Sequence, residues 1–245
     1  MKCLSRILQL AGLIVIAVWM IPGRAASIAN AFKELAASID PSGCFLRFSV
    51  HHVAQLILTI LFMKVFSDGK LSEWGFNLRE SKLSLRIFGW FCLIYLLPVF
   101  LYNVLPTLIS GHSPQFNYPL TPRNVAGTLG FQFFLSGTCE EPLFRGFVMV
   151  CLAQSWKGII RMGGFSFPIS GLWATLIFML AHANISFVPF SISASFWQQV
   201  WSLGLGLYYA AVFHRTGSLL APILSHGYSN GVVSLALYSM ASLMR

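Results

Sequence analysis

The chain has 245 residues, of which 56% are hydrophobic and only 9% are charged, and its formal net charge is +9. Soluble domains carry about 25% charged residues, so a soluble globular protein is excluded and lipid must surround most of this chain. The basic residues stand mainly at the ends of apolar runs, which is the placement that controls membrane topology, so no nucleic-acid partner is expected.

Seven apolar segments follow one another, most of them close to the roughly 20 residues that a transmembrane helix needs. They predict an all-α fold, a polytopic transmembrane bundle of about seven to eight spans, because the fourth segment is long enough to contain a kink or break. The segments are 7–22, 44–66, 87–105, 125–156, 167–185, 195–213 and 217–244.

The first apolar segment fits two interpretations. Lys2 and Arg6 precede it, and the small residues of GRAAS follow it, a pattern that also fits a signal peptide cleaved near Ala26. Because polytopic proteins seldom need a removable signal, we favour an uncleaved first span.

The basic residues predict the orientation. If the spans alternate in direction, one side of the membrane receives most of the Lys and Arg residues and the other keeps few. The positive-inside rule then places the N-terminus and the polar loop 67–86 in the cytoplasm, in an inner or plasma membrane. The residues of the basic side are Lys2, Arg6, Lys64, Lys70, Arg79, Lys82, Arg86, Lys157, Arg161 and Arg215.

Two adjacent acids, Glu140 and Glu141, interrupt the fourth apolar segment. They are the only acidic residues after Glu80, and an ionised acid at a helix centre costs about 2.5–3.5 kcal/mol. Glu141 and Arg145 have the i, i+4 spacing of a helical ion pair, so we interpret them as structural. Glu140 has no such partner. Pro142 follows, and we expect the helix to bend or restart there, with a helix N-terminus near both carboxylates.

Two other segments bring polar groups to membrane depth. His182 ends the fifth segment, and His226 and Asn230 share one helix face in the seventh. Lipid rejects such groups, so we expect these three residues and Glu140 to line one cavity. The fourth segment runs on to basic residues at 157 and 161, so we expect the cavity to open toward that end. The remaining His residues are interpreted as packing, loop or interfacial residues: His51, His52, His112 and His214.

The motifs Glu-Glu-x-x-x-Arg, Phe-x-x-x-His and His-x-x-x-Asn, in this order on three segments, resemble those of a known family. This is the CPBP family of intramembrane CAAX proteases and bacteriocin-processing proteins, also called the Abi family, which includes the type II CAAX prenyl endopeptidases. The resemblance that carries these motifs covers about residues 125–235. We therefore divide the chain into N-terminal helices with a cytoplasmic loop, 1–124, and a catalytic core, 125–245.

The resemblance implies an intramembrane endopeptidase that cleaves a membrane-associated or lipidated protein or peptide. Glu140 would activate the attacking water with His182 assisting, and His226 and Asn230 would stabilise the oxyanion. The ion pair beside Glu140 would hold the site together. Membrane lipid and the peptide substrate are the expected partners.

A metal is the open point of this hypothesis. Glu140, His182 and His226 would be its ligands, the two-His and one-Glu set of some zinc proteases. Since the chain has no His-Glu-x-x-His motif, we favour a metal-free site without a cofactor, with zinc as the alternative. Two other classes stay open: a proton-coupled transporter, in which Glu140 and the His pair relay protons, and a non-proteolytic membrane scaffold or immunity-type protein.

Overall fold

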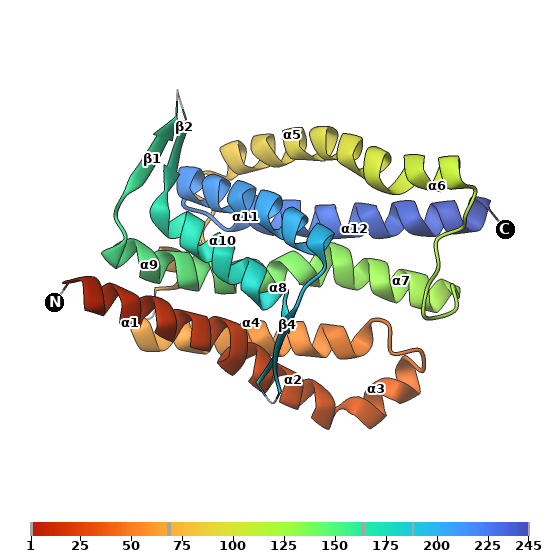
Figure 1. Cartoon of the computed structure of the whole chain (residues 1–245), viewed down its shortest axis with the longest axis horizontal. Helices are drawn as coiled ribbons and strands as arrows, with labels where there is room; N and C mark the ends of the chain where they lie inside the picture. Colours follow the sequence, from red (N-terminus) through yellow and green to blue (C-terminus); the bar gives the residue numbers. More distant parts are fainter. Residues whose placement is uncertain (1, 68–69, 163–164, 188, 245) are drawn as a thin grey trace.

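The N-terminal half of the molecule consists of long apolar helices. In the computed structural model, which describes residues 2–67, 70–162, 165–187 and 189–244, these helices lie along the long axis of a bundle (Figure 1). Their bounds are α1 (Lys2–Ile14), the π-helical η1 (Val15–Met20), α2 (Ile21–Ala31), α3 (Lys33–Ile39), α4 (Leu46–Phe66), the 3₁₀ turn η2 (Leu71–Trp74), α5 (Ser81–Val99), the π-helical η3 (Phe100–Val104) and α6 (Leu105–Ser110).

Three helical stretches in the described chain are long and apolar enough to cross a membrane. They are Leu4–Ala31, Leu46–Phe66 and Ser81–Ser110, with mean hydropathies of 2.1, 1.5 and 2.0. Many of their large apolar side chains face outward, as a lipid-facing surface requires. The molecule is therefore an integral membrane protein.

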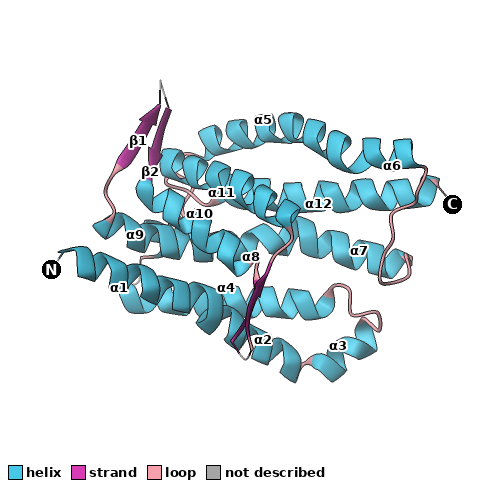
Figure 2. Cartoon of the chain, in the orientation of Figure 1, coloured by secondary structure: helices cyan, strands magenta, loops and turns pink. Residues whose placement is uncertain are grey.

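The C-terminal half contains one long helical run and three further helices. The run passes without interruption from Pro122 to Ser155, and two β-hairpins flank α10 (Figure 2). The bounds are α7 (Pro122–Gly130), η4 (Phe131–Ser136), α8 (Gly137–Glu141), η5 (Pro142–Met149), α9 (Val150–Ser155), β1 (Ile159–Met162), β2 (Phe165–Pro168), α10 (Ile169–Ala181), β3 (Asn184–Phe187), β4 (Phe190–Ser193), α11 (Phe196–Thr216) and α12 (Leu220–Leu243).

The all-α class is confirmed, with one local correction. Within the described residues the strands form only two antiparallel hairpins, in which Ile159 pairs with Pro168 and Asn184 with Ser193. The fifth apolar segment, expected at 167–185, is a shorter helix, because each of its ends continues into one of these hairpins.

We expected the helix to bend or restart at Pro142, but it does not restart there. Glu141 (φ −62°, ψ −37°) and Pro142 (φ −56°, ψ −40°) both keep right-handed helical dihedrals, and the following turns are π-helical. Proline lacks an N–H and its ring clashes with the carbonyl four residues earlier in an α-helix. The wider i→i+5 turn accommodates this proline without a break. Because the described run from Gly137 to Met149 is continuous, it offers the carboxylates no free helix N-terminus.

Glycines bring α12 against the long helical run. A Cβ on Gly137 would collide with the carbonyl oxygen of Ile223, and one on Gly227 with that of Phe133. Small residues at such contacts let two helix backbones approach closely in a membrane protein. This contact places His226, which precedes Gly227 directly, beside the Glu140–Glu141 pair.

The two ends of the bundle differ in charge. The N-terminus, the end of α9 and the β1–β2 hairpin lie at one end, on the left of Figure 1, whereas the C-terminus, α6 and the start of α7 lie at the other. Lys157 and Arg161 therefore lie at the same end as the N-terminus. Between this end and Glu140 the core is filled, because every residue from Glu141 to Met149 is buried.

Candidate active site

Glu141 lies in a closed polar network. Its Oε1 accepts hydrogen bonds from Arg145 Nη1 at 3.1 Å and from His226 Nδ1 at 2.7 Å. The side chains of Glu141 and Arg145 are both 0% exposed. Arg145 Nη2 also donates to the carbonyl of Gly206 at 3.0 Å. The predicted i, i+4 ion pair therefore exists, and it is dry.

Aromatic rings enclose this network. The guanidinium carbon of Arg145 lies 4.7 Å from the ring centre of Phe178 and 5.3 Å from that of Tyr209. Tyr209 also stacks on the imidazole of His226, at 5.2 Å and an interplanar angle of 11°. Cation–π contacts of this kind strengthen when water is excluded, so the rings stabilise the arginine and hold the His226 ring in place.

Glu140 faces the opposite way, toward three imidazoles. Its Oε1 lies 3.0 Å from His52 Nε2, and its Oε2 lies 4.0 Å from His182 Nε2 and 3.9 Å from His226 Nε2. Oε2 itself is buried and has no hydrogen-bond partner among the described residues. The carboxylate thus has one held oxygen and one free oxygen, and the free one faces two ring nitrogens.

The hydrogen bonds made by Nδ1 of His182 and of His52 determine which ring nitrogen carries a proton. Nδ1 of His182 lies 2.8 Å from the carbonyl oxygen of Phe178, and Nδ1 of His52 lies 2.9 Å from that of Phe48. A carbonyl only accepts, so both Nδ1 atoms are protonated. In its neutral form His182 therefore presents an unprotonated Nε2 toward Glu140.

His52 belongs to the site, which the sequence did not predict. We interpreted it as a packing or interfacial residue, but among the described side chains it makes the shortest polar contact to the Glu140 carboxylate. Its ring is held edge-on by Phe131, with ring centres 4.8 Å apart. When Glu140 is ionised, the proton that the two groups share lies on His52 Nε2, which then donates to Oε1. The only signal in the sequence was a polar residue at membrane depth without a motif.

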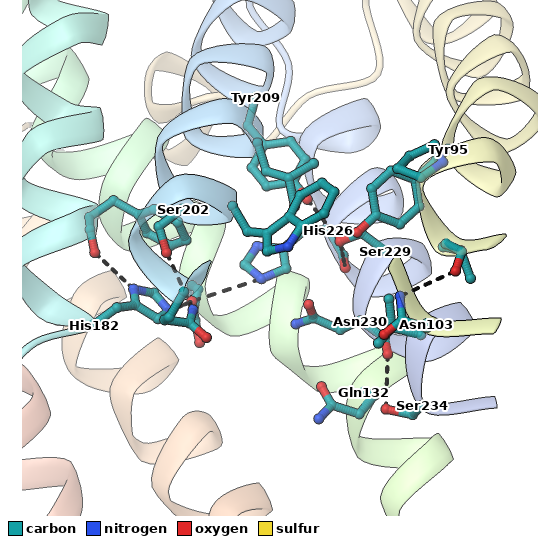
Figure 3. A pocket seen from close by; sticks show the side chains of 18 residues that line it. Tyr95, Asn103, Gln132, His182, Ser202, Tyr209, His226, Ser229, Asn230 and Ser234 are labelled. Atoms are coloured by element: carbon teal, nitrogen blue, oxygen red, sulfur yellow. Dashed lines mark hydrogen bonds and ion pairs between the residues drawn. The ribbon is translucent and has the colours of Figure 1, made fainter. Parts of the chain in front are cut away.

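The site opens into a cavity of about 410 Å³. Glu140, His182, His226 and Asn230 all line it, so the expectation that these four share one cavity is confirmed. Figure 3 shows His182, at the end of α10, and His226 and Asn230, both on α12, reaching into it. Neither His51 nor His52 is among its lining residues, and His51 packs edge-on against His52.

The cavity extends in the direction opposite to the one we expected. Its other lining residues include Gln132, Asn103 and Ser234, which lie toward the start of α7, toward α6 and toward the end of α12. These elements mark the end of the bundle away from Lys157. The expectation was wrong because buried side chains fill η5, the part of the long helical run between Glu140 and the basic end.

The distances from Oε2 of Glu140 to Nε2 of His182 and of His226 indicate whether these groups could bind a metal. Two ligands of a tetrahedral zinc at about 2.0–2.1 Å lie roughly 3.3 Å apart, whereas Glu140 Oε2 lies 4.0 and 3.9 Å from the two Nε2 atoms. Within the described residues, no group of three His, Cys, Asp or Glu side chains has the geometry of a metal site. As they stand, the side chains are spaced for a bridging water better than for zinc.

Fold and site together define a class: an integral membrane helix bundle with a carboxylate–imidazole centre at the inner end of a cavity. Residues 122–232 match the family model described as type II CAAX prenyl endopeptidase Rce1-like. The match confirms the resemblance that the three motifs indicated, and it supports an intramembrane protease of the CAAX type. Neither the curated proteins nor the solved structures contain a match to the chain.

Proposed function

We propose that the protein is an intramembrane endopeptidase that hydrolyses a peptide bond of a membrane-associated or lipidated protein by means of a water activated by Glu140. The observation that carries the proposal is the free Oε2 of Glu140, which faces Nε2 of His182 at 4.0 Å and Nε2 of His226 at 3.9 Å. A single water at hydrogen-bond distances of about 2.8 Å bridges such separations.

The reaction then runs through four groups. Oε2 of Glu140 takes a proton from the bridging water, whose oxygen attacks the carbonyl carbon of the substrate. The oxyanion is stabilised by the Asn230 amide and by His226, whose positive form is supported by Glu141 behind it. The C–N bond breaks, and the proton held by Glu140, with His182 assisting, passes to the leaving amine. The products are a carboxylic acid and an amine.

His52 has a positioning role in this scheme. By donating to Oε1 at 3.0 Å it orients the Glu140 carboxylate so that Oε2 faces the water. His52 does not contact the position of the attacking water, so its effect passes through Glu140.

The scheme contains no metal. Zinc is the alternative, and Glu140, His182 and His226 would have to move closer together to bind it. As a Lewis acid, zinc would supply polarisation of the carbonyl and a more acidic water.

A proton-coupled transporter receives no support from the arrangement of the core. A proton path has to continue beyond Glu140 toward the basic end of the bundle. There the segment from Leu143 to Met149 is buried and its polar side chain, Arg145, is engaged by Glu141 and Gly206.

The decisive experiment is cleavage by the purified protein in nanodiscs. Wild type and Glu140→Gln are incubated with membrane-protein fragments, and products are detected by mass spectrometry. We expect products only with wild type, and an unchanged rate after treatment with a chelator. Loss of activity on chelation, restored by zinc, would replace the metal-free scheme by the zinc alternative. Equal product from both proteins, or none from either, would contradict the proposal and, in the second case, favour a scaffold.

We further propose a cytoplasmic N-terminus in an inner or plasma membrane, from the excess of basic residues at that end. The cavity would then face the non-cytoplasmic half of the bilayer. Reporters fused at Ser72 measure this orientation, and a fusion active only on the outer side would reverse it.

A further inference from the structure

The cavity continues past the catalytic groups, where neutral polar side chains alternate with apolar ones such as Val99 and Val233. Gln132 precedes Glu140 by about two helical turns on the same helical run, and Asn230 follows His226 by one turn on α12. Figure 3 shows both amides directed into the cavity, with Asn103 and Ser234 nearby. These side chains form a polar strip that leads away from Glu140.

The amides of Gln132 and Asn230 make no hydrogen bond to any residue that the structure describes. Asn103 and Gln198, which also line the cavity, differ in this respect. Asn103 Nδ2 donates to the carbonyl of Val99, and Gln198 Nε2 donates to Ser202 Oγ, both at 3.3 Å. Half-buried amides without partners are costly, so the two free amides are suited to a ligand with its own donors and acceptors.

The charge of the wall excludes several ligands. No Lys or Arg is among the described residues that line the cavity. A free carboxylate or a phosphate headgroup is normally bound by a cation. A hydrocarbon chain would displace the water molecules that hydrogen-bond to the amides and would offer no hydrogen bonds in their place. A peptide backbone matches the unpaired amides and the lack of cationic side chains, because each backbone unit offers one N–H and one C=O and carries no charge.

We propose that Gln132, with Asn230 between it and the catalytic carboxylate, forms a subsite that binds the backbone of an extended, uncharged, internal segment of the substrate. This proposal rests on the proposed function. The eight-residue offset between Gln132 and Glu140 corresponds to about 12 Å along a helix. An extended chain covers that distance in about three to four residues. The subsite therefore contacts the third or fourth residue from the cleaved bond.

Peptide binding tests the subsite independently of cleavage. The Glu140→Gln protein is immobilised in nanodiscs and exposed to a mixed-sequence library of uncharged octapeptides, acetylated and amidated at their ends. A second library has free C-terminal carboxylates. We expect the blocked library to be retained about tenfold better, and this retention to fall about tenfold when Gln132→Leu is added. Gln198→Leu is the matched control, because that amide already has a partner, and should leave retention unchanged.

Gln132→Asn shortens the side chain and should reduce retention less than Gln132→Leu, while thermal unfolding verifies that each variant is folded. Better retention of the free carboxylates, or equal retention by the Gln132 and Gln198 variants, would overturn the subsite. Cleavage by wild type that is indifferent to Gln132 would also overturn the subsite but leave the proposed function intact. Retention that depends on Gln132, without any cleavage by wild type, would overturn the proposed function alone.

Discussion

Glu140 and Glu141 are neighbours in the chain, yet they belong to two different regions of the site. Glu141 lies in the closed network, where Arg145 and His226 saturate one oxygen and aromatic rings exclude water. Oε2 of each glutamate lacks a hydrogen-bond partner among the described residues, but Glu140 lies at the wall of the cavity, with its side chain 16% exposed and Oε2 facing two imidazoles. Two chemically identical groups therefore differ in environment because one helix presents them to different surroundings.

His226 connects the two regions. Its Nδ1 contacts Glu141 at 2.7 Å, and its Nε2 faces Glu140 at 3.9 Å. A positive charge formed on this ring is stabilised from behind by a buried carboxylate, in the way that a buried acid supports the histidine of a hydrolase triad. In the proposed mechanism the closed region therefore has two functions, which are to hold the helices together and to stabilise the imidazole that faces the cavity.

The largest expected effect is on turnover. Glu140→Gln keeps the shape and the hydrogen bond to His52 but removes the base, so we expect peptide cleavage to fall by at least about 10³-fold. The unfolding temperature in detergent should change little, because His52 can release its Nε2 proton and accept a hydrogen bond from the new amide instead. Initial rates and thermal unfolding on the same preparation measure both. Cleavage near the wild-type rate would remove Glu140 from the catalytic role.

In the closed region, by contrast, a substitution should lower the stability of the protein. Glu141→Ala leaves the Arg145 charge buried and unpaired, which costs about 3–5 kcal/mol, so we expect low yield and a much lower unfolding temperature. Glu141→Gln retains an acceptor for Arg145 and is the milder control. A Glu141→Ala protein as stable as wild type would show that the pair contributes nothing to folding.

Substitutions of His52 test whether this residue positions the Glu140 carboxylate. His52→Leu removes the hydrogen bond to Oε1, and we expect kcat to fall by about 10–100-fold with little change in KM, because only the orientation of the base is lost. His52→Gln can still donate to Oε1 and should recover part of the rate. His51→Leu is the matched control, since His51 contacts His52 but makes no hydrogen bond to Glu140 in the described part of the chain. Equal losses in the Leu and Gln variants of His52 would contradict a positioning role.

The smallest effect concerns a third buried carboxylate, far from the site. Asp40 accepts hydrogen bonds from the backbone N–H groups of Cys44, Phe45 and Leu46, at the start of α4. Burial alone would raise the pKa of Asp40, but these backbone hydrogen bonds together lower it below its usual value. Asp40 therefore stabilises the fold most above the unfolded pKa of about 3.9, and this contribution is lost as the pH falls through the lower folded value.

Asp40→Asn should accordingly cost on the order of 1–2 kcal/mol at pH 7. Thermal unfolding of wild type and variant from pH 7 down to pH 3 measures the difference, which should shrink at the acidic end. A difference that is constant over this range would show that the carboxylate charge has no part in holding the start of α4.

The sequence predicted those parts of the site that depend on spacing along a helix. Glu141 and Arg145 pair because residues four apart share a helix face, and His226 and Asn230 line the same cavity for the same reason. The cost of polar groups in lipid also predicted that helices far apart in the chain would bring them together. The pairing of His52 with Glu140, across 88 residues, follows no local rule and could not be predicted.

By itself, then, the sequence determined the membrane class, the helical architecture, the closed ion pair and four polar residues of the cavity, Glu140, His182, His226 and Asn230. It could do so because composition and helical periodicity are local properties of the chain. Only the tertiary structure decided the partner of Glu140, the π-helical passage through Pro142 and the direction in which the cavity opens. Each of these depends on how closely helices pack. The glycine contacts of Gly137 and Gly227 bring α12 against the long helical run, and the filled core of η5 closes the basic end. Such packing is a property of the whole set of side chains, which no single segment encodes.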